Sequence, residues 1–392
     1  MVRAADLPQI TGDVEATRQR YTANGAVPPP LAGSIQNNAL AQLNLGWELD
    51  LFGRNRAALE SAIGSARAAQ ADAQAARILL ASQVVQNYVQ LARLQDQLVV
   101  AERALAQRNE TLTIVKDRFE AGLDTRLEVR QSEGGLPETR TQIEQLREQV
   151  ALTRNALAAL VGQPARAAQI EAGDLAQLRL PALPQSLPAS LLGRRADVVA
   201  ARWRVEAVQQ GIAEAKARFY PDVNLTAFVG LSSLGFNHWM ESSSRQWGVG
   251  PAITLPIFEG GRLRANLRGT SADYDAAVEN YNQTVIDAVH DVADQLASVA
   301  SVGRQQTEQA DATATAESAY DIARQRYAAG LGNYLSVLTA ETNVLTQRRL
   351  SVDLAARALQ TRVALAHALG GGYAEDAATA GAAPSVALKA PN

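Results

Sequence analysis

Two pairs of segments alternate apolar and polar residues with a period of two. In residues 38–51 the apolar side chains fall on every second position, with Trp47 among them. Residues 9–21 form the other member of that pair, and the segments 223–231 and 249–257 repeat the pattern later in the chain. Because neighbouring side chains of a strand point to opposite faces, this alternation predicts four strands, each with one apolar and one polar face.

The segments that follow the strands have the composition and spacing of long helices. From Arg54 to about Arg118 the chain contains no Pro and a single Gly. From Leu91 onward the apolar residues recur at intervals of three and four, with Arg108 as the one lapse. That spacing is typical of the seam of a coiled coil. A helix of this length would extend on the order of 100 Å, far more than a globular core can cover, so we expect it to lie against other long helices.

A second helix is expected to return along the first. Gly134, Gly135 and Pro137 lie near its start and predict a kink or a short break there. We expect seven segments: a first strand pair (1–52), a first long helical hairpin (53–162), a Pro-rich connector (163–193), a helix leading to the second strands (194–220), a second strand pair (221–258), a second long hairpin (259–369) and a disordered tail (370–392).

A six-residue motif occurs twice and relates the two halves of the chain. Residues 118–123 read Arg-Phe-Glu-Ala-Gly-Leu, and residues 326–331 read Arg-Tyr-Ala-Ala-Gly-Leu. The same offset of 208 residues separates Gly162 from Gly370 without a gap, which indicates an internal duplication. Gly readily takes the left-handed conformation that ends a helix, so each motif predicts the tip of a helical hairpin.

Composition and charge exclude several classes of function. The formal net charge is −3, whereas a nucleic-acid-binding face needs a surplus of basic residues. The chain has no Cys, which excludes disulfides, thiolate catalysis and Cys-based metal sites. His238, His290 and His367 are the only His residues, and none has a partner at a metal-ligand spacing. No catalytic grouping or phosphate-binding Gly loop occurs, so we expect no catalysis, no metal and no cofactor.

The four strands raise the question of what covers their apolar faces. Four strands are too few to close a membrane barrel, for which about eight are the practical minimum. Either several chains pool their strands into one barrel, or the sheet is a small cap on a soluble coiled coil. Strands of about 10–13 residues, with Trp47, Trp239 and Trp247 near their ends, suit the pooled barrel. The sequence has no apolar run of ~20 residues, as a membrane helix needs, and no visible N-terminal signal sequence.

Four further stretches, together with the two tip motifs, resemble a known family. They are residues 47–53 (Trp-Glu-Leu-Asp-Leu-Phe-Gly), 191–198 (Leu-Leu-Gly-Arg-Arg-Ala-Asp-Val), 217–225 (Ala-Arg-Phe-Tyr-Pro-Asp-Val-Asn-Leu) and 256–261 (Pro-Ile-Phe-Glu-Gly-Gly). Over roughly residues 5–370 the chain resembles the TolC family of outer-membrane efflux proteins, in particular the OprM/NodT-like lipoprotein branch of RND efflux systems.

The resemblance implies a mainly α protein with β, built as a TolC-like duct with two internal repeats. A homotrimer would pool four strands per protomer into a 12-stranded outer-membrane β-barrel, which a long α-helical barrel continues across the periplasm of a Gram-negative cell. The implied function is passive export of drugs or other small molecules, energised by an inner-membrane RND-type pump through a periplasmic adaptor protein. The alternative is a non-channel coiled-coil scaffold of the cell envelope.

The chain departs from the pattern of that family in two places. A helix over 194–219 precedes the second strand pair, but only seven residues precede Pro8, the counterpart of Pro221. The matching helix is absent, as are the signal peptide and the lipid-bearing Cys of the lipoprotein branch, so we expect a truncated chain or a misplaced start. Beyond the second tip, relatives often place Leu and Asp four residues apart. Here these positions hold Leu335 and Thr339, and no ring of Asp is expected.

The resemblance also assigns the tips a role in docking. Gly122, Leu123, Gly330 and Leu331 match the part of the family that contacts the adaptor. The alternative is that each Gly only ends a helix while each Leu packs locally.

Two further groups of residues receive roles in the same way. The first is a periplasmic gate close to the tips, and its members are Glu128, Tyr327, Leu335 and Thr339. The alternative is a solvated Glu with a packed Tyr and Leu. The second is a set of aromatic residues at the membrane interface, and its members are Trp47, Phe236, Trp239 and Trp247. The alternative for the last three is a collapsed surface loop.

Overall fold

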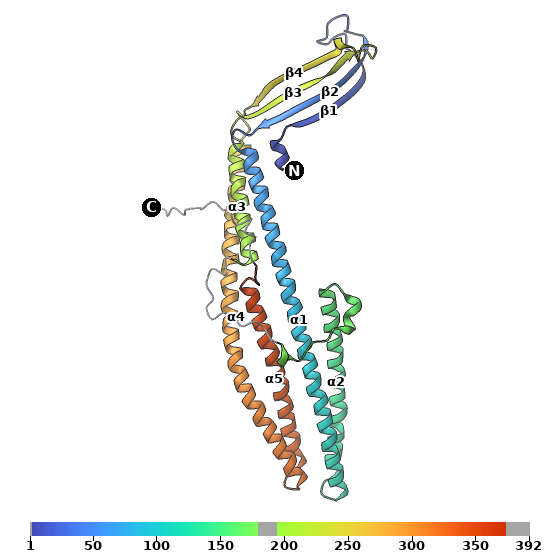
Figure 1. Ribbon diagram of the computed structural model, residues 1–392, viewed down its shortest axis with the longest axis vertical. Coiled ribbons are helices and arrows are strands. Elements are labelled where there is room, and N and C mark those ends of the chain that lie inside the picture. Colours follow the sequence, from blue (N-terminus) through green and yellow to red (C-terminus); the bar gives the residue numbers. More distant parts are fainter. Residues whose placement is uncertain (1, 179–193, 374–392) are drawn as a thin grey trace, which may run out of the picture. The chain divides into compact units, whose positions relative to one another are not determined.

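The structure, a computed structural model, describes residues 2–178 and 194–373 (Figure 1). The strands are β1 (Gln9–Arg20), β2 (Ile35–Leu49), β3 (Asp222–Leu234) and β4 (Arg245–Thr254). The α-helices are α1 (Arg54–Glu120), α2 (Arg126–Leu160), α3 (Ala196–Ala217), α4 (Arg262–Ala328) and α5 (Tyr334–Ala368). Short 3-10 helices are η1 (Val2–Asp6), η2 (Pro164–Gln169), η3 (Leu175–Gln177) and η5 (Ser242–Ser244). Most of the predicted disordered tail (374–392) and part of the predicted connector (179–193) lie outside the described residues.

The helices α4 and α5 have the same lengths as α1 and α2 and begin and end at corresponding positions. α1 and α4 each have 67 residues, and α2 and α5 each have 35. The first and last residues of each later helix lie 208 positions after those of its earlier counterpart. The predicted mainly α fold with four strands and two internal repeats is therefore confirmed.

The two hairpin tips end their first helices in the same way. The backbone has a φ of +74° at Gly122 and +75° at Gly330, a conformation that costs Gly little. The next N–H then turns back to the helix: Leu123 N donates to the Arg118 carbonyl (2.8 Å), and Leu331 N donates to the Arg326 carbonyl (2.7 Å). This pattern satisfies carbonyl groups that the helix end would otherwise leave without a donor.

The four strands form one antiparallel sheet in the order β1-β2-β3-β4. The register is continuous through all three strand pairs, beginning with Gln9 opposite Gly46. Within the described chain, β1 and β4 each pair on one side only. Both are therefore edge strands with unpaired backbone groups.

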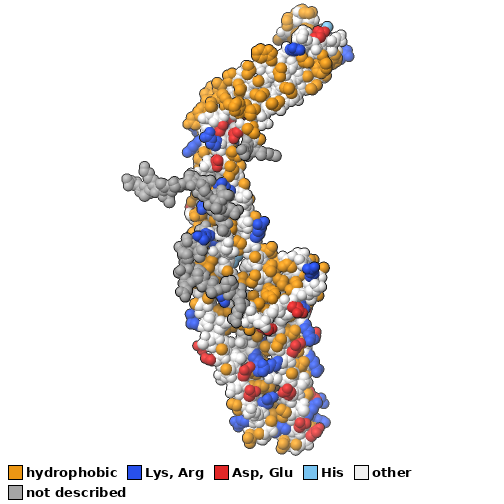
Figure 2. Space-filling model, viewed as in Figure 1, with side chains coloured by type: hydrophobic (Ala, Val, Ile, Leu, Met, Phe, Trp, Pro, Cys, Tyr) orange, Lys and Arg blue, Asp and Glu red, His pale blue; other side chains and the backbone are white. Residues whose placement is uncertain are grey.

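The register separates the side chains of the sheet into an apolar and a polar face. On the apolar face one row runs from Ile10 through Leu45 and Ala227 to Val249. Val249 is 67% exposed, and other large apolar side chains on this face are similarly open to solvent. Figure 2 shows hydrophobic side chains gathered over the strands. Apart from η1, which contacts Trp47, no described element covers this face, although a soluble sheet would bury it against another layer.

The chain divides into two compact units. The first consists of Met1–Ala71 and Val199–Gln283, and the second of Asp72–Val198 and Thr284–Asn392. In the first unit, α3 packs on α1 through small residues. A Cβ placed on Gly64 would lie 3.0 Å from the Cβ of Ala207, and the Arg67 guanidinium lies 4.4 Å from the ring centroid of Trp203.

In the second unit the helices pack through apolar clusters that include a small one between α1, η3 and α5 (Val89, Ala92, Leu175, Ala356 and Leu359) and two larger ones. One joins α1 to α2, and its buried members are Leu91, Leu94, Ala101, Ile143, Leu146, Val150 and Leu157. The other joins the end of α1 to α4 and α5, and its buried members are Val115, Ala316, Tyr320, Tyr327, Tyr334, Val337 and Val344. Among the described residues, no helix combines the length and the apolar character that a membrane span requires.

Arg108, the lapse in the apolar seam of α1, connects three helices. Its Nη1 donates to the Gly135 carbonyl (2.8 Å) and to Thr139 Oγ1 (2.8 Å) on α2. Its Nε donates to Glu341 Oε1 (3.0 Å) on α5, and only 17% of the Arg108 side chain is exposed. A charged residue in the seam is thus paired with a carboxylate and hydrogen-bonded to both neighbouring helices, as burial requires.

A short break at Gly134, Gly135 and Pro137 is absent, and that part of the prediction is wrong, whereas a kink there stays a prediction. α2 continues unbroken from Arg126 to Leu160 with Pro137 inside it. Leu136 is 8% exposed, and the Gly135 carbonyl accepts from α1 at the same turn. Packing against α1 therefore outweighs the low helix propensity of this segment.

Candidate functional site

The tips present small and apolar groups to solvent. Gly122 and Gly330 are exposed, and a Cβ built on Gly122 would meet nothing within 4 Å. Leu123 is 64% exposed and Leu331 70%. Neither Leu packs locally in the described chain, so each tip offers an accessible backbone next to an apolar side chain.

A polar network joins the two tips. Arg118 Nε forms an ion pair with Asp124 Oδ2 (3.0 Å), and Arg118 Nη1 donates to the Tyr327 carbonyl (2.9 Å). The Tyr327 hydroxyl donates to Asp124, and the Arg118 guanidinium lies 4.6 Å from the centroid of the Tyr327 ring. The loop after α1 is thereby tied to the last turn of α4.

The network includes a buried phenol whose pKa is raised. Tyr327 is 1% exposed, and burial together with its hydrogen bond to Asp124 raises its pKa. The hydrogen bond to Asp124 also raises the pKa of Arg118, so this guanidinium remains charged. Tyr327 was predicted at a gate, but its buried ring lines no surface of the described chain. It contacts Asp124 and Arg118 instead.

Sequence reasoning did not single out Arg118 or Asp124 as functional residues. The signal lies in the difference between the two repeats. At the offset of 208, Tyr327 replaces Phe119 and Gly332 replaces Asp124. The hydroxyl and its acceptor therefore each occur in one copy only, and the contact between them joins the two copies.

The other predicted gate residues have different environments. Glu128 completes a capping box at the start of α2, where Thr125 N donates to Glu128 Oε2 (2.9 Å). The hydrogen bond from the Thr125 side chain lowers the pKa of Glu128. Leu335 is 64% exposed, and Thr339 is exposed one turn later on the same face of α5. The Thr339 hydroxyl donates to the Leu335 carbonyl (2.9 Å).

The predicted interface aromatics lie at two levels. Trp47 is on the apolar face two residues before the end of β2, and its Nε1 donates to the Asp6 carbonyl (3.1 Å). Trp247 is on the same face near the start of β4 and is 76% exposed. Phe236 and Trp239 lie in the loop between β3 and β4, where Phe236 is 52% exposed and Trp239 is half-buried.

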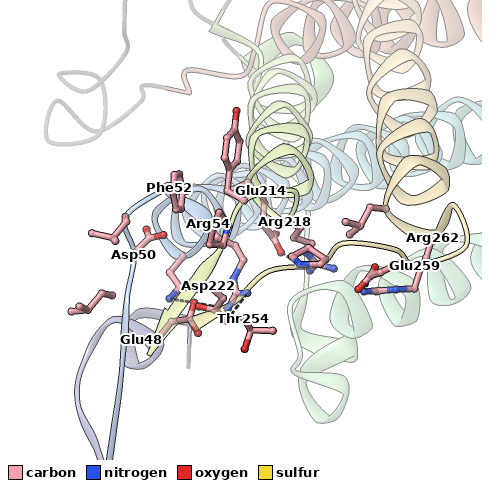
Figure 3. Close-up of a pocket in the computed structure, with 18 residues that line it drawn as sticks. Glu48, Asp50, Phe52, Arg54, Glu214, Arg218, Asp222, Thr254, Glu259 and Arg262 are labelled. Carbon is pink, nitrogen blue, oxygen red and sulfur yellow. Dashed lines mark hydrogen bonds and ion pairs between the residues drawn. The ribbon is translucent and has the colours of Figure 1, made fainter. Parts of the chain in front are cut away.

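A cavity of about 550 Å³ lies where the strands meet the helices of the first unit (Figure 3). Arg54 pairs there with Glu48 and with Asp222 (3.5 Å). Phe52 and Tyr220 stack at its edge, with ring centroids 4.9 Å apart. The opposite charges in this cavity pair with one another, so the residues fix the strand-to-helix junction. No group of acidic and His residues with metal-binding geometry occurs in the described part of the chain.

The chain matches the family model "Outer membrane efflux protein" over residues 1–163 and 187–371. It is 41% identical over 276 residues to the fusaric acid resistance protein FusA of Burkholderia cepacia, and the match covers 69% of this chain and 52% of FusA. It is 34% identical over 371 residues to the probable efflux pump outer membrane protein SepC of Pseudomonas putida, with coverage of 95% and 77%. The chain thus spans about half of FusA and about three quarters of SepC.

Solved structures agree with these sequence matches. The outer membrane protein VceC of Vibrio cholerae is 37% identical, with a TM-score of 0.88 over 95% of this chain and 89% of VceC. The outer-membrane channel OprN is 28% identical, with a TM-score of 0.85 over 95% of this chain and 83% of OprN. The chain therefore belongs to the outer membrane efflux protein family.

Proposed function

We propose that the chain is the outer-membrane channel subunit of a tripartite efflux pump, through which drugs or other small molecules pass passively to the exterior. The observation that supports this most directly is the four-stranded sheet with an exposed apolar face and two unpaired edges. Relatives named as efflux pump outer membrane proteins, such as SepC, support the same function. Export would be energised by an inner-membrane RND-type pump and not by this chain.

The dimensions of the apolar face suit a bilayer. The apolar positions of β2 extend from Ala39 to Leu49, ten residue steps or about 33 Å along the strand. At the tilt of about 40° found in membrane barrels, this length spans about 25 Å of membrane thickness, the height of the apolar band of outer-membrane barrels.

The unpaired edges support a homotrimer. Closed barrels satisfy every backbone group, which a membrane-exposed sheet edge does not. Four strands from each of three protomers make 12, within the range known for bacterial outer-membrane barrels. In such a barrel β4 of one protomer pairs with β1 of the next.

We assign the tips to adaptor docking. The exposed Leu123 and Leu331 supply apolar contact area, and Gly122 and Gly330 let a partner helix tip approach the backbone closely. A tip–tip contact of this kind suits a periplasmic adaptor protein with its own helical hairpin.

We propose that two groups of residues form the periplasmic gate. Leu335 and Thr339 provide an exposed strip on α5 beside the tip, which three protomers would bring together around the pore axis. Arg118, Asp124 and Tyr327 hold the tips together behind this strip. Glu128 supports the same region as a helix cap.

The proposal is tested by locating the protein and measuring its pores. We expect it in the outer-membrane fraction as a trimer that dissociates on heating in SDS, and we expect ion conductance in planar bilayers. Val249→Arg places a charge on the apolar face and should cost about 2–4 kcal/mol at mid-membrane, which reduces insertion. Thr226→Arg on the opposite face is the matched control and should insert normally.

A protein that remains outside the outer membrane, forms no pores and tolerates Val249→Arg as well as Thr226→Arg would be a coiled-coil scaffold of the envelope.

A further inference from the structure

The charged residues of the sheet are divided between its two faces by sign. The polar face holds four acidic residues and no basic ones, namely Asp13, Glu15, Glu48 and Asp222. The apolar face holds three basic residues and no acidic ones, namely Arg18, Arg20 and Arg245. All residues of the four strands are described, so this division holds for the whole sheet.

The three arginines lie at the outer end of the apolar band. Arg245 lies opposite Leu231, in the same row as Ala41 and Val14. Arg18 follows Val14 by four positions, about 13 Å along the strand, and Arg20 follows by six, about 20 Å. All three side chains are exposed. The arginines are thus placed at and beyond the end of the band that lies away from the start of α1.

The strand order brings the arginines together at protomer boundaries. Arg18 and Arg20 belong to the edge strand β1, and Arg245 belongs to the other edge strand, β4. In a barrel that closes by pairing β4 with β1 of the next protomer, Arg245 of one chain faces the same boundary as Arg18 and Arg20 of its neighbour. A trimer would then have three such clusters, each with three positive charges.

We propose that Arg18, Arg20 and Arg245 bind the phosphate groups of an anionic glycolipid in the outer leaflet of the outer membrane. This inference rests on the proposed function, because it requires the apolar face to be in the membrane. Guanidinium groups bind phosphate oxygens in bidentate pairs. Acyl chains of the same lipid would lie along the apolar face below, beside Val14 and Trp247.

The charge pattern favours this ligand over a zwitterionic lipid. The ammonium group of a zwitterionic headgroup would need an acidic partner, and the apolar face has none in its four strands. The position also fits. An arginine on the lipid-facing side destabilises a barrel by about 2–4 kcal/mol at the bilayer midplane but only by about 0–1 kcal/mol at the interface.

The test compares two lipids on the purified, detergent-solubilised trimer. Native mass spectrometry counts the molecules of bisphosphorylated lipid A, or of the same lipid without phosphates, that each trimer retains. We expect wild type to prefer the phosphorylated lipid, with a preference that falls as salt rises. The variant R18Q/R20Q/R245Q should lose roughly fivefold in affinity per arginine, on the order of 100-fold in all, and with it the preference.

A control of equal charge separates this site from general electrostatics. R140Q/R349Q/R357Q removes three exposed arginines from the helices α2 and α5 and should leave the preference intact. Equal retention of both lipids by wild type, or an equal loss in both triple variants, would overturn the inference. If R18Q/R20Q/R245Q forms no trimer, the comparison of the two lipids on wild type still decides.

Conductance of the same samples distinguishes the two proposals. A wild-type trimer that conducts but shows no preference for phosphorylated lipid rejects the lipid site and leaves the channel function standing. A wild-type protein that forms neither trimers nor pores rejects the channel function.

Discussion

Replacing Arg108 by Met tests whether a buried ion pair fixes the first hairpin against the second. Met fills much of the space of the arginine stem, so the main effect is the loss of the guanidinium. Glu341, with 8% of its side chain exposed, then lacks its cation, and the Gly135 carbonyl and the Thr139 hydroxyl lose a donor. Removing one partner of a buried pair costs about 3–5 kcal/mol. Because Arg108 retains 17% exposure, we expect a free energy of unfolding lower by about 3 kcal/mol.

Two changes at Glu341 extend this test. Glu341→Gln keeps an acceptor for Arg108 Nε and should cost about 1–2 kcal/mol. The double variant Arg108→Met/Glu341→Met removes both charges and should be nearly as stable as wild type, since replacing a whole buried pair by apolar groups is often neutral. The expected signature is therefore a double variant more stable than Arg108→Met alone.

The pH dependence of stability adds an independent readout. Burial is the largest cause that raises the pKa of Glu341 above its value in the unfolded chain. A carboxyl with a raised pKa in the folded state favours folding most at low pH, and this contribution is lost as the pH rises through the folded-state pKa. Glu341→Gln should therefore flatten the stability profile in the range above the ordinary pKa of Glu.

The measurement is urea unfolding of the detergent-solubilised protein, followed by circular dichroism. Arg140→Met, which removes an exposed arginine of α2, is the control and should stay within about 0.5 kcal/mol of wild type. If Arg108→Met also stays within 1 kcal/mol, or the double variant is no more stable than Arg108→Met, the buried pair does not join the hairpins.

Three further predictions concern the tips and the sheet. Gly122→Trp or Gly330→Trp should reduce efflux, measured as drug resistance, while SDS-resistant trimers still form; normal resistance in both variants would reject adaptor docking. Tyr327→Phe removes a hydrogen bond to a charged group worth about 1.5–3 kcal/mol, so the open fraction in single-channel recordings should rise about 10- to 100-fold, and unchanged recordings would count against the gate. Gly230→Ala should lower the dissociation temperature of the trimer, because its Cβ would lie 2.3 Å from the Ala41 carbonyl oxygen. Gly46→Ala, which meets nothing within 4 Å, is the control, and an equal shift in both would contradict the steric reason.

The sequence predicts most elements of the fold because their patterns are local. Period-two alternation located the strands, and the absence of Pro located the long helices. The start of β2 was missed: the strand begins at Ile35, three residues before the predicted start. Residues 36–38 are all polar and show no alternation, and their pairing with β1 holds them in the sheet. The sequence pattern of one strand does not show how far a neighbouring strand pairs with it.

The candidate sites were predictable only in part, for a related reason. The glycine tips follow from a local rule about helix ends, so their positions could be read directly. The partners of Tyr327 could not, because Arg118 and Asp124 lie more than 200 residues away in the sequence. The chemistry of Glu128 was also hidden, since an acidic residue three positions after Thr125 serves as a cap as readily as a gate.

Two polar contacts between the repeats involve positions at which the repeats differ in sequence. Duplication explains why α1 and α4 have equal lengths, as do α2 and α5, and why each pair begins and ends at corresponding positions. Two of the contacts that join the copies come from positions where the copies have diverged: Arg108 corresponds to Ala316, and Asp124 corresponds to Gly332. In both cases a charged group of the first copy reaches a residue of the second, Glu341 or Tyr327. A channel that opens must move one hairpin relative to the other without unfolding either. Apolar contacts hold each hairpin together and also join α1 to α4 and α5, so the polar contacts of Arg108 and Asp124 are the specific ones that such a movement would exchange.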